Sequence, residues 1–211
     1  RRALLELAGY AFDVCPADVD ETVLPGEDPA GYVLRLCAEK ARRVSSRRVA
    51  DGLSAAERAA GWVLAADTTV TDGADVLGKP ADAAEAAALL RRLRGRTHTV
   101  LTGVAALDLA TGALATDLCR TAVTLRNYSD AEMAAYIASG DPLDKAGAYA
   151  IQHNGFRPVA ALSGCYANVV GLPLCVVGRL LAGGPAPNGA GRCDGDPAAC
   201  PFTDSLVRLG W

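Results

Sequence analysis

The sequence has no long apolar run and no strong excess of charge of either sign. The longest apolar stretch, around residues 169–177, is interrupted by Gly171 and Pro173 and falls short of the roughly 20 residues that a membrane helix needs. The formal net charge is only −3, which argues against a nucleic-acid-binding protein. We therefore expect neither a membrane span nor a nucleic-acid partner, and a polyanionic small substrate would need a local cluster of Lys and Arg.

Histidines are scarce, and paired cysteine motifs are missing. The chain has seven cysteines, an odd number, with no C-x-x-C pair, and only two histidines, which argues against a zinc site. Reduced cysteines packed as small apolar residues fit a reducing compartment, so we expect a cytoplasmic protein. The sequence shows no signal peptide and begins at Arg1 instead of Met, from which we expect that an N-terminal segment is missing.

Helix and strand signals alternate along the chain, which predicts an α/β domain over residues 1–182. Helices are expected at residues 3–9, 29–44, 82–95, 129–140 and 174–181. Strands are expected at residues 11–15, 62–66, 97–107 and 113–125, with further strand-like segments between 147 and 170. Residues 45–60 are expected to be a loop or frayed helix end, and residues 183–211, rich in Gly, Pro and Ala, a disordered tail.

Two carboxylates are candidates for metal binding or proton transfer. Asp67 follows an apolar strand, where α/β sheets place their ligands, and it could hold a divalent metal or take a proton from water. Glu21 ends an acidic stretch, and Mg²⁺ prefers oxygen ligands of this kind. The alternatives are that Asp67 caps a turn and that Glu21 belongs to a solvated acidic loop.

Three basic residues and one amide are candidates for substrate binding. Lys40 borders the apolar stripe of its helix, and Lys79 lies just ahead of a helix N-terminus, a place that attracts phosphate. Arg1 could bind phosphate oxygens with its forked guanidinium, and Gln152 could read a base edge. Each has a plainer alternative. Lys40 would only reach back to water, Lys79 would be an ordinary loop lysine, Arg1 would be a disordered terminus, and Gln152 would be an exposed strand residue.

The order of several short motifs resembles the Maf family of nucleotide pyrophosphatases. The matching stretches cover about residues 1–182; they are Arg1-Arg2, residues 16–21, 36–41, 65–70, 77–80, 95–98, 139–149 and 168–173. This resemblance implies a mixed, twisted sheet with flanking helices, in two lobes around a central cleft, as in inosine triphosphate pyrophosphatases. It also implies hydrolysis between the α- and β-phosphates of a nucleoside triphosphate.

The resemblance also implies roles for individual residues. The family's catalytic Asp matches Asp67, its metal-associated Glu matches Glu21, and its phosphate-binding lysines match Lys40 and Lys79. Thr68 and Gln152 match the subgroup that acts on dTTP and UTP. Arg1 best matches the second arginine of the family's opening motif, so the first strand, the serine and the first arginine are absent here. His153 follows Ile-Gln where the family usually has Gly, so we expect the loop near the base to differ in shape from that of the family.

We therefore predict a pyrophosphatase that converts dTTP and UTP, and modified pyrimidine nucleotides as further substrates, to the monophosphate and pyrophosphate. Mg²⁺ or Mn²⁺ is the expected cofactor, the nucleoside triphosphate the expected partner, and a homodimer is in keeping with the family. Two alternatives stay open. One is a 7-methyl-GTP-type pyrophosphatase, and the other is a nucleotide-binding regulatory protein without turnover.

Overall fold

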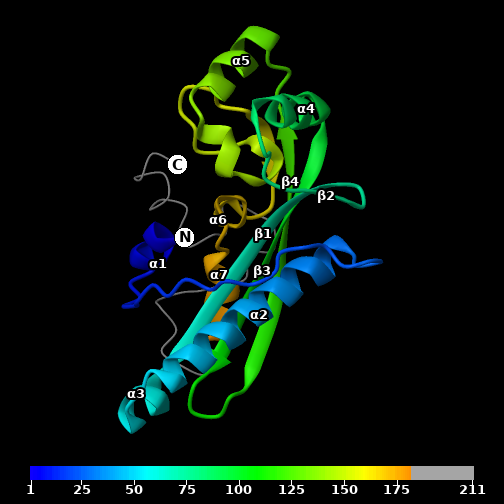
Figure 1. The fold of residues 1–211 in the computed structure, drawn as a ribbon. Coiled ribbons are helices and arrows are strands. Elements are labelled where there is room, and N and C mark those ends of the chain that lie inside the picture. The colour runs from blue at the N-terminus through cyan, green and yellow to red at the C-terminus, as the bar shows by residue number, and fades with distance from the viewer. Residues whose placement is uncertain (182–211) are drawn as a thin grey trace.

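The computed structural model describes residues 1–181, which form a five-stranded sheet with helices packed on it (Figure 1). The strands are β1 (Trp62–Asp72), β2 (Asp75–Leu77), β3 (Thr97–Asp108), β4 (Leu114–Leu125) and β5 (Val159–Ser163). Their order is β2-β1-β3-β4-β5, and each neighbouring pair is antiparallel. The α/β fold expected from the sequence is confirmed, but within residues 1–181 the sheet is wholly antiparallel and not mixed as expected.

The helices are α1 (Arg2–Leu7), α2 (Pro29–Ala50), α3 (Ala55–Ala60), α4 (Ala83–Leu93), α5 (Asp130–Ala138), α6 (Tyr166–Val170) and α7 (Leu174–Leu180), with 3₁₀ turns η1 (Asp141–Asp144) and η2 (Ala146–Ala148). Some helices lie along the long strands, as α2 does, and others, such as α4 and α5, lie at the end of the strands that is at the top of Figure 1. Helix α2 packs on β1 and β3, and α6 and α7 pack on β3 and β4.

The hydrophobic core of residues 1–181 is divided into three clusters, and β1 shows how the sheet separates two of them. Val63 and Ala65 pack in the cluster under α2, whereas Leu64 and Ala66 pack in the cluster of α1, α6 and α7. Successive side chains of a strand point to opposite faces, so the next two residues, Asp67 and Thr68, point to the α2 face and the α6 face respectively.

The third cluster lies at the other end of the strands and forms a second lobe. It gathers apolar side chains of β1, α4, β3, β4, α5 and η2 with those of the segment that follows; its buried members include Val70, Leu90, Val100, Tyr128 and Tyr149. The cleft described below lies where this lobe meets the α1–α6–α7 cluster.

Several predicted elements are confirmed. The 97–125 hairpin is present, with Leu107 paired to Leu114. The Ser129–Glu132 capping box and helices near residues 3–9 and 174–181 are also present. Asp82 caps α4 as expected, but Glu85 accepts a hydrogen bond from the Ala81 N–H, so the predicted capping box at Asp82 is not closed.

Other predicted elements are wrong. Residues 11–15 form no strand, and the helix expected to end near residue 44 continues to Ala50, with α3 lying inside the predicted loop. Strand β1 does not end at Asp67, because β3 pairs with it from Trp62 to Thr71. After Gly147 the described chain holds one strand, β5, and Gln152 lies in a turn instead of a strand.

Two further predictions concern other parts of the chain. The predicted tail, residues 183–211, lies outside the described residues. Within residues 1–181, none of the helices has the length and apolar character that crossing a membrane requires.

Candidate active site

Asp67, Lys40 and Glu21 form one ion cluster at the middle of β1. The ammonium of Lys40 donates to Asp67 Oδ1 and to Glu21 Oε1, both at 2.6 Å. Asp67 is 8% exposed, and it comes from the sheet, whereas Lys40 comes from α2 and Glu21 from the segment ahead of α2. The structure therefore brings together three of the predicted site residues from three separate parts of the sequence.

A close approach of α2 to the sheet places Lys40 beside Asp67. Asp67 pairs with Gly103 on β3, and a Cβ atom on Gly103 would lie only 2.6 Å from the carbonyl oxygen of Val33 in α2. The buried face of α2 includes Val33, Leu36 and Cys37, and Lys40 follows Leu36 by one helical turn. Glycine at position 103 thus lets the helix lie close enough for its lysine to reach the carboxylate.

Glu21 belongs to a segment without regular structure that is tied to α2 by hydrogen bonds. The hydroxyl of Tyr32 donates to the Glu21 carbonyl at 2.9 Å, and Arg35 donates to the Thr22 carbonyl at 3.0 Å. Arg35 also forms a two-point ion pair with Glu27, at 2.6 and 2.8 Å. These contacts hold the Glu21 carboxylate over the helix face that carries Lys40.

The ion cluster shifts the pKa of two of its members. Burial acts to lower the pKa of Lys40, but the hydrogen bonds that its ammonium donates to Asp67 and Glu21 outweigh this, and the pKa is raised. The hydrogen bond from Lys40 holds the pKa of Glu21 below its ordinary value, with smaller contributions from the charges of Lys79 and Arg1. Lys40 is therefore a fixed cation at neutral pH, and Glu21 a fixed carboxylate.

Arg1 lies near the same place but contacts the opposite face of the sheet. Its Nε donates to the Gly171 carbonyl at 2.8 Å, and its Nη2 donates to Thr68 Oγ1 at 3.1 Å. Burial lowers the pKa of Arg1, while the charges of Asp67 and Glu21 oppose that shift. The guanidinium is thus within electrostatic reach of the ion cluster while it contacts the neighbour of Asp67.

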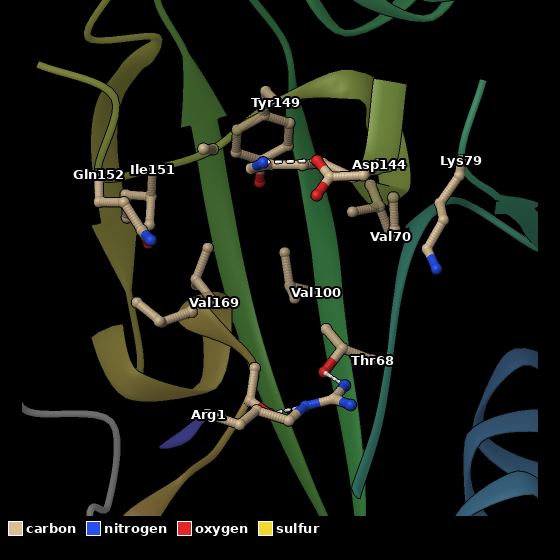
Figure 2. A pocket seen from close by; sticks show the side chains of 15 residues that line it. Arg1, Thr68, Val70, Lys79, Val100, Asp144, Tyr149, Ile151, Gln152 and Val169 are labelled. Atoms are coloured by element: carbon tan, nitrogen blue, oxygen red, sulfur yellow. Dashed lines mark hydrogen bonds and ion pairs between the residues drawn. The ribbon is translucent and has the colours of Figure 1, made fainter. Parts of the chain in front are cut away.

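A cavity of about 520 Å³ opens on this face, and four of the predicted residues line it: Arg1, Thr68, Lys79 and Gln152 (Figure 2). In Figure 2, Arg1 and Thr68 lie at one end, Gln152 on one side and Lys79 on the other. Lys79 follows β2 and Gln152 sits in the turn after η2, and both are exposed. Asp67, Lys40 and Glu21 are not among the residues of the cavity wall, but Asp67 directly precedes Thr68 in the chain, and the charges of Arg1 and Lys79 in the wall act on Glu21.

Sequence reasoning missed several residues of the cavity wall. Tyr149 lines the far end, where its hydroxyl is 2.7 Å from Nε2 of the buried His98, and Asp144 and Lys145 form an ion pair at its edge. Val70, Val100 and Val169 supply an apolar part of the wall. Residues 144–149 belong to one of the matched motifs, which was the available signal for this part of the site.

The carboxylate pair fits a divalent cation that is also bound by substrate. Within residues 1–181, no three His, Cys, Asp or Glu side chains are grouped as in a metal site built by protein alone. Asp67 and Glu21 do direct oxygens at one point, which the Lys40 ammonium occupies. Mg²⁺ is commonly held by one or two carboxylates with waters and substrate phosphates, and these two residues would hold it in that way.

Comparison with known proteins gives a consistent set of relatives. A dTTP/UTP pyrophosphatase of Myxococcus xanthus (strain DK1622) is 51% identical over 189 residues, 89% of this chain and 90% of the relative. Two others with the same name are 45% identical (Syntrophotalea carbinolica; 86% of this chain, 79% of the relative) and 48% identical (Anaeromyxobacter dehalogenans strain 2CP-C; 89% and 91%). Residues 1–183 match the family described as Maf-like protein, and this chain belongs to that family.

Proposed function

We propose that this protein hydrolyses dTTP and UTP to the monophosphate and pyrophosphate. The names of its relatives support this activity, and one structural observation carries it to this chain. A carboxylate cluster with a fixed ammonium, Asp67–Lys40–Glu21, adjoins a cavity whose wall holds Arg1 and Lys79. A triphosphate needs both parts, because cations must bind its phosphates and a carboxylate must activate the attacking water.

Each residue of the site has a distinct part in this proposal. Asp67 takes the proton of the water that attacks the α-phosphorus; the bond from that phosphorus to the oxygen bridging the α- and β-phosphates breaks, and pyrophosphate leaves. Arg1, Lys40 and Lys79 neutralise the charge that develops on the phosphate oxygens. A Mg²⁺ or Mn²⁺ ion held by Asp67 and Glu21 would polarise the phosphate oxygens when it is bound.

The remaining parts of the proposal concern selectivity and setting. Thr68 and Gln152, which both line the cavity, contact the base in this proposal. We place the activity in the cytoplasm, where nucleoside triphosphates are used, and the active form as a homodimer in keeping with the family. Modified pyrimidine nucleotides belong to the same substrate class.

Pyrophosphate release from UTP, dTTP, CTP and 7-methyl-GTP with Mg²⁺ or Mn²⁺ tests the activity. We expect turnover of UTP and dTTP in preference to 7-methyl-GTP, and a loss of about 100-fold or more in kcat for Asp67→Asn. Asp72→Asn is the matched control, because Asp72 lies on the same strand but pairs with Arg92 and Arg96. A folded Asp67→Asn variant with wild-type turnover would contradict the role of Asp67, and nucleotide binding without release would favour a regulatory protein.

A further inference from the structure

A line of four hydrogen-bonding groups runs along the α6 face of the sheet from the cavity into the core. Arg1 Nη2 donates to Thr68 Oγ1 at 3.1 Å, and Thr68 Oγ1 is 2.9 Å from Thr102 Oγ1 on the neighbouring strand. Thr102 Oγ1 is in turn 3.1 Å from the backbone carbonyl of Asn168, in α6. Thr102 and Asn168 are both 0% exposed, so their hydrogen bonds are made inside the protein.

The carbonyl at the buried end sets the direction of every proton in this line. A carbonyl oxygen only accepts, so the single hydroxyl proton of Thr102 lies toward Asn168. Thr102 Oγ1 then has only lone pairs for Thr68, and the Thr68 proton must lie toward Thr102. The opposite order would leave two buried oxygens 3.1 Å apart with no proton between them, which is unfavourable in a medium of low polarity.

Thr68 therefore faces the cavity as an acceptor. Its proton is committed to Thr102, one lone pair receives Arg1, and the other is available to a ligand. An acceptor does not suit phosphate oxygens, which are themselves acceptors, but it suits an N–H group. We propose that buried Thr102 is a positioning residue that fixes Thr68 as the acceptor for the imide N–H of uracil or thymine.

The wall beside Thr68 has the shape of a base-binding surface. Val70 lies two residues along β1 from Thr68, and Val100 two residues along β3 from Thr102, so all four side chains share one face of the sheet. In Figure 2, Val100 and Val169 lie between Thr68 at one end and Tyr149 at the other. A base lying on these valines would present its edge to Thr68. Uracil and thymine carry N3–H at that edge, whereas cytosine carries an unprotonated N3.

The inference rests on the proposed function and is tested by the base preference of Thr102→Val. Valine has the shape of threonine but no hydroxyl, so the Thr68 proton becomes free to turn toward the cavity and donate to cytosine N3. We expect the ratio of kcat/KM for UTP to that for CTP to fall by about tenfold, mainly through KM. Thr102→Ser keeps the hydroxyl and should restore the wild-type ratio.

The matched control is Thr97→Val, on the same strand. Thr97 pairs with Thr124 by a similar threonine–threonine contact of 2.8 Å but does not line the cavity, so its ratio should equal that of the wild type. An unchanged ratio in a folded Thr102→Val variant, or a wild type with no preference for UTP over CTP, would overturn the inference alone. A wild type that releases no pyrophosphate from UTP would instead overturn the proposed function.

Discussion

His98 is a titratable side chain in the second lobe, and its environment keeps it neutral. It is 4% exposed, and its Nε2 is hydrogen-bonded to the hydroxyl of Tyr149, a residue of the cavity wall. Burial lowers the pKa of His98 to about 4, against an ordinary value of 6.5, and the charge of Asp72 opposes this only weakly. The unfolded chain therefore binds a proton at this side chain over a pH range where the folded protein does not.

That difference predicts a loss of stability in mild acid. As the pH falls from 6.5 to about 4, the unfolded state gains a proton at His98 before the folded state does, so the free energy of unfolding decreases. We expect His98 to account for a decrease on the order of 2 kcal/mol in this range. Urea unfolding of the wild type and of His98→Gln at several pH values between 7 and 4 gives the unfolding free energy of each protein as a function of pH. The contribution of His98 is the amount by which the difference between the two free energies decreases as the pH falls. Parallel curves would show that His98 titrates alike in both states.

The sequence identifies the charged residues of the site better than its buried polar ones. Asp67, Lys40 and Glu21 stand in recognisable motifs, and the structure places them in contact. Thr102 lies in the ordinary strand pattern Val-Leu-Thr-Gly-Val, and its partner Asn168 is 66 residues further along the chain. No local pattern distinguishes such a threonine from one that only favours the strand conformation, because its role depends on a contact distant in sequence.

At the scale of elements, the contact between α2 and β3 controls both stability and the position of Lys40. Gly103→Ala would place a Cβ atom 2.6 Å from the Val33 carbonyl oxygen and 2.8 Å from its carbon, which are backbone atoms that move only with the helix. We expect a loss of about 1–3 kcal/mol in unfolding free energy, together with reduced turnover, because Lys40 is carried away from Asp67. Thermal unfolding and pyrophosphate release measure the two effects.

Gly78→Ala is the control for this substitution. A Cβ atom on Gly78 meets no atom within 4 Å, and its φ lies outside the left-handed region, so its unfolding free energy should stay within about 0.5 kcal/mol of the wild type. Should Gly103→Ala unfold at the wild-type temperature with full turnover, α2 would have to tolerate displacement, and the close approach would not be what places Lys40.

Element boundaries were mispredicted where a segment leaves the sheet or where polar residues enter it. The apolar stripe of α2 stops at Val44, but the helix continues to Ala50. Arg47 and Arg48 lie in its last turn, where their positive charge interacts favourably with the negative end of the helix dipole. Strand β1 continues beyond Asp67 because β3 pairs with it, although its side chains there, apart from Val70, are polar. Residues 11–15 have a strand-like pattern but pair with none of the described strands.

At the scale of the whole molecule, the cavity joins two parts of the core. Arg1 precedes α1, whose Leu4 packs in the α1–α6–α7 cluster, whereas Val70, Val100 and Tyr149 belong to the cluster of the second lobe. The order of motifs predicts that these residues form one site, but it gives no information on which face of the sheet each one occupies. The alternation along β1 puts Asp67 and Thr68 on opposite faces, and the pairing register decides which of the two points toward α2.

A ligand that contacts both lobes should stabilise the whole chain. A non-hydrolysable UTP analogue with an α,β-imido bridge, present with Mn²⁺ at 100 times its Kd, should raise the unfolding free energy by about 2.7 kcal/mol. This corresponds to roughly 5–10 °C in Tm for a protein of this size. EDTA should reduce the shift if Asp67 and Glu21 bind the cation together with the phosphates.

Lys79→Met should weaken binding of the same analogue about tenfold, because Lys79 is a cation of the cavity wall. Arg91→Met, which removes an exposed cation of α4 outside that wall, should leave the shift unchanged. An equal loss in both variants would mean that net charge governs binding, and that the cavity cations do not contact the phosphates individually.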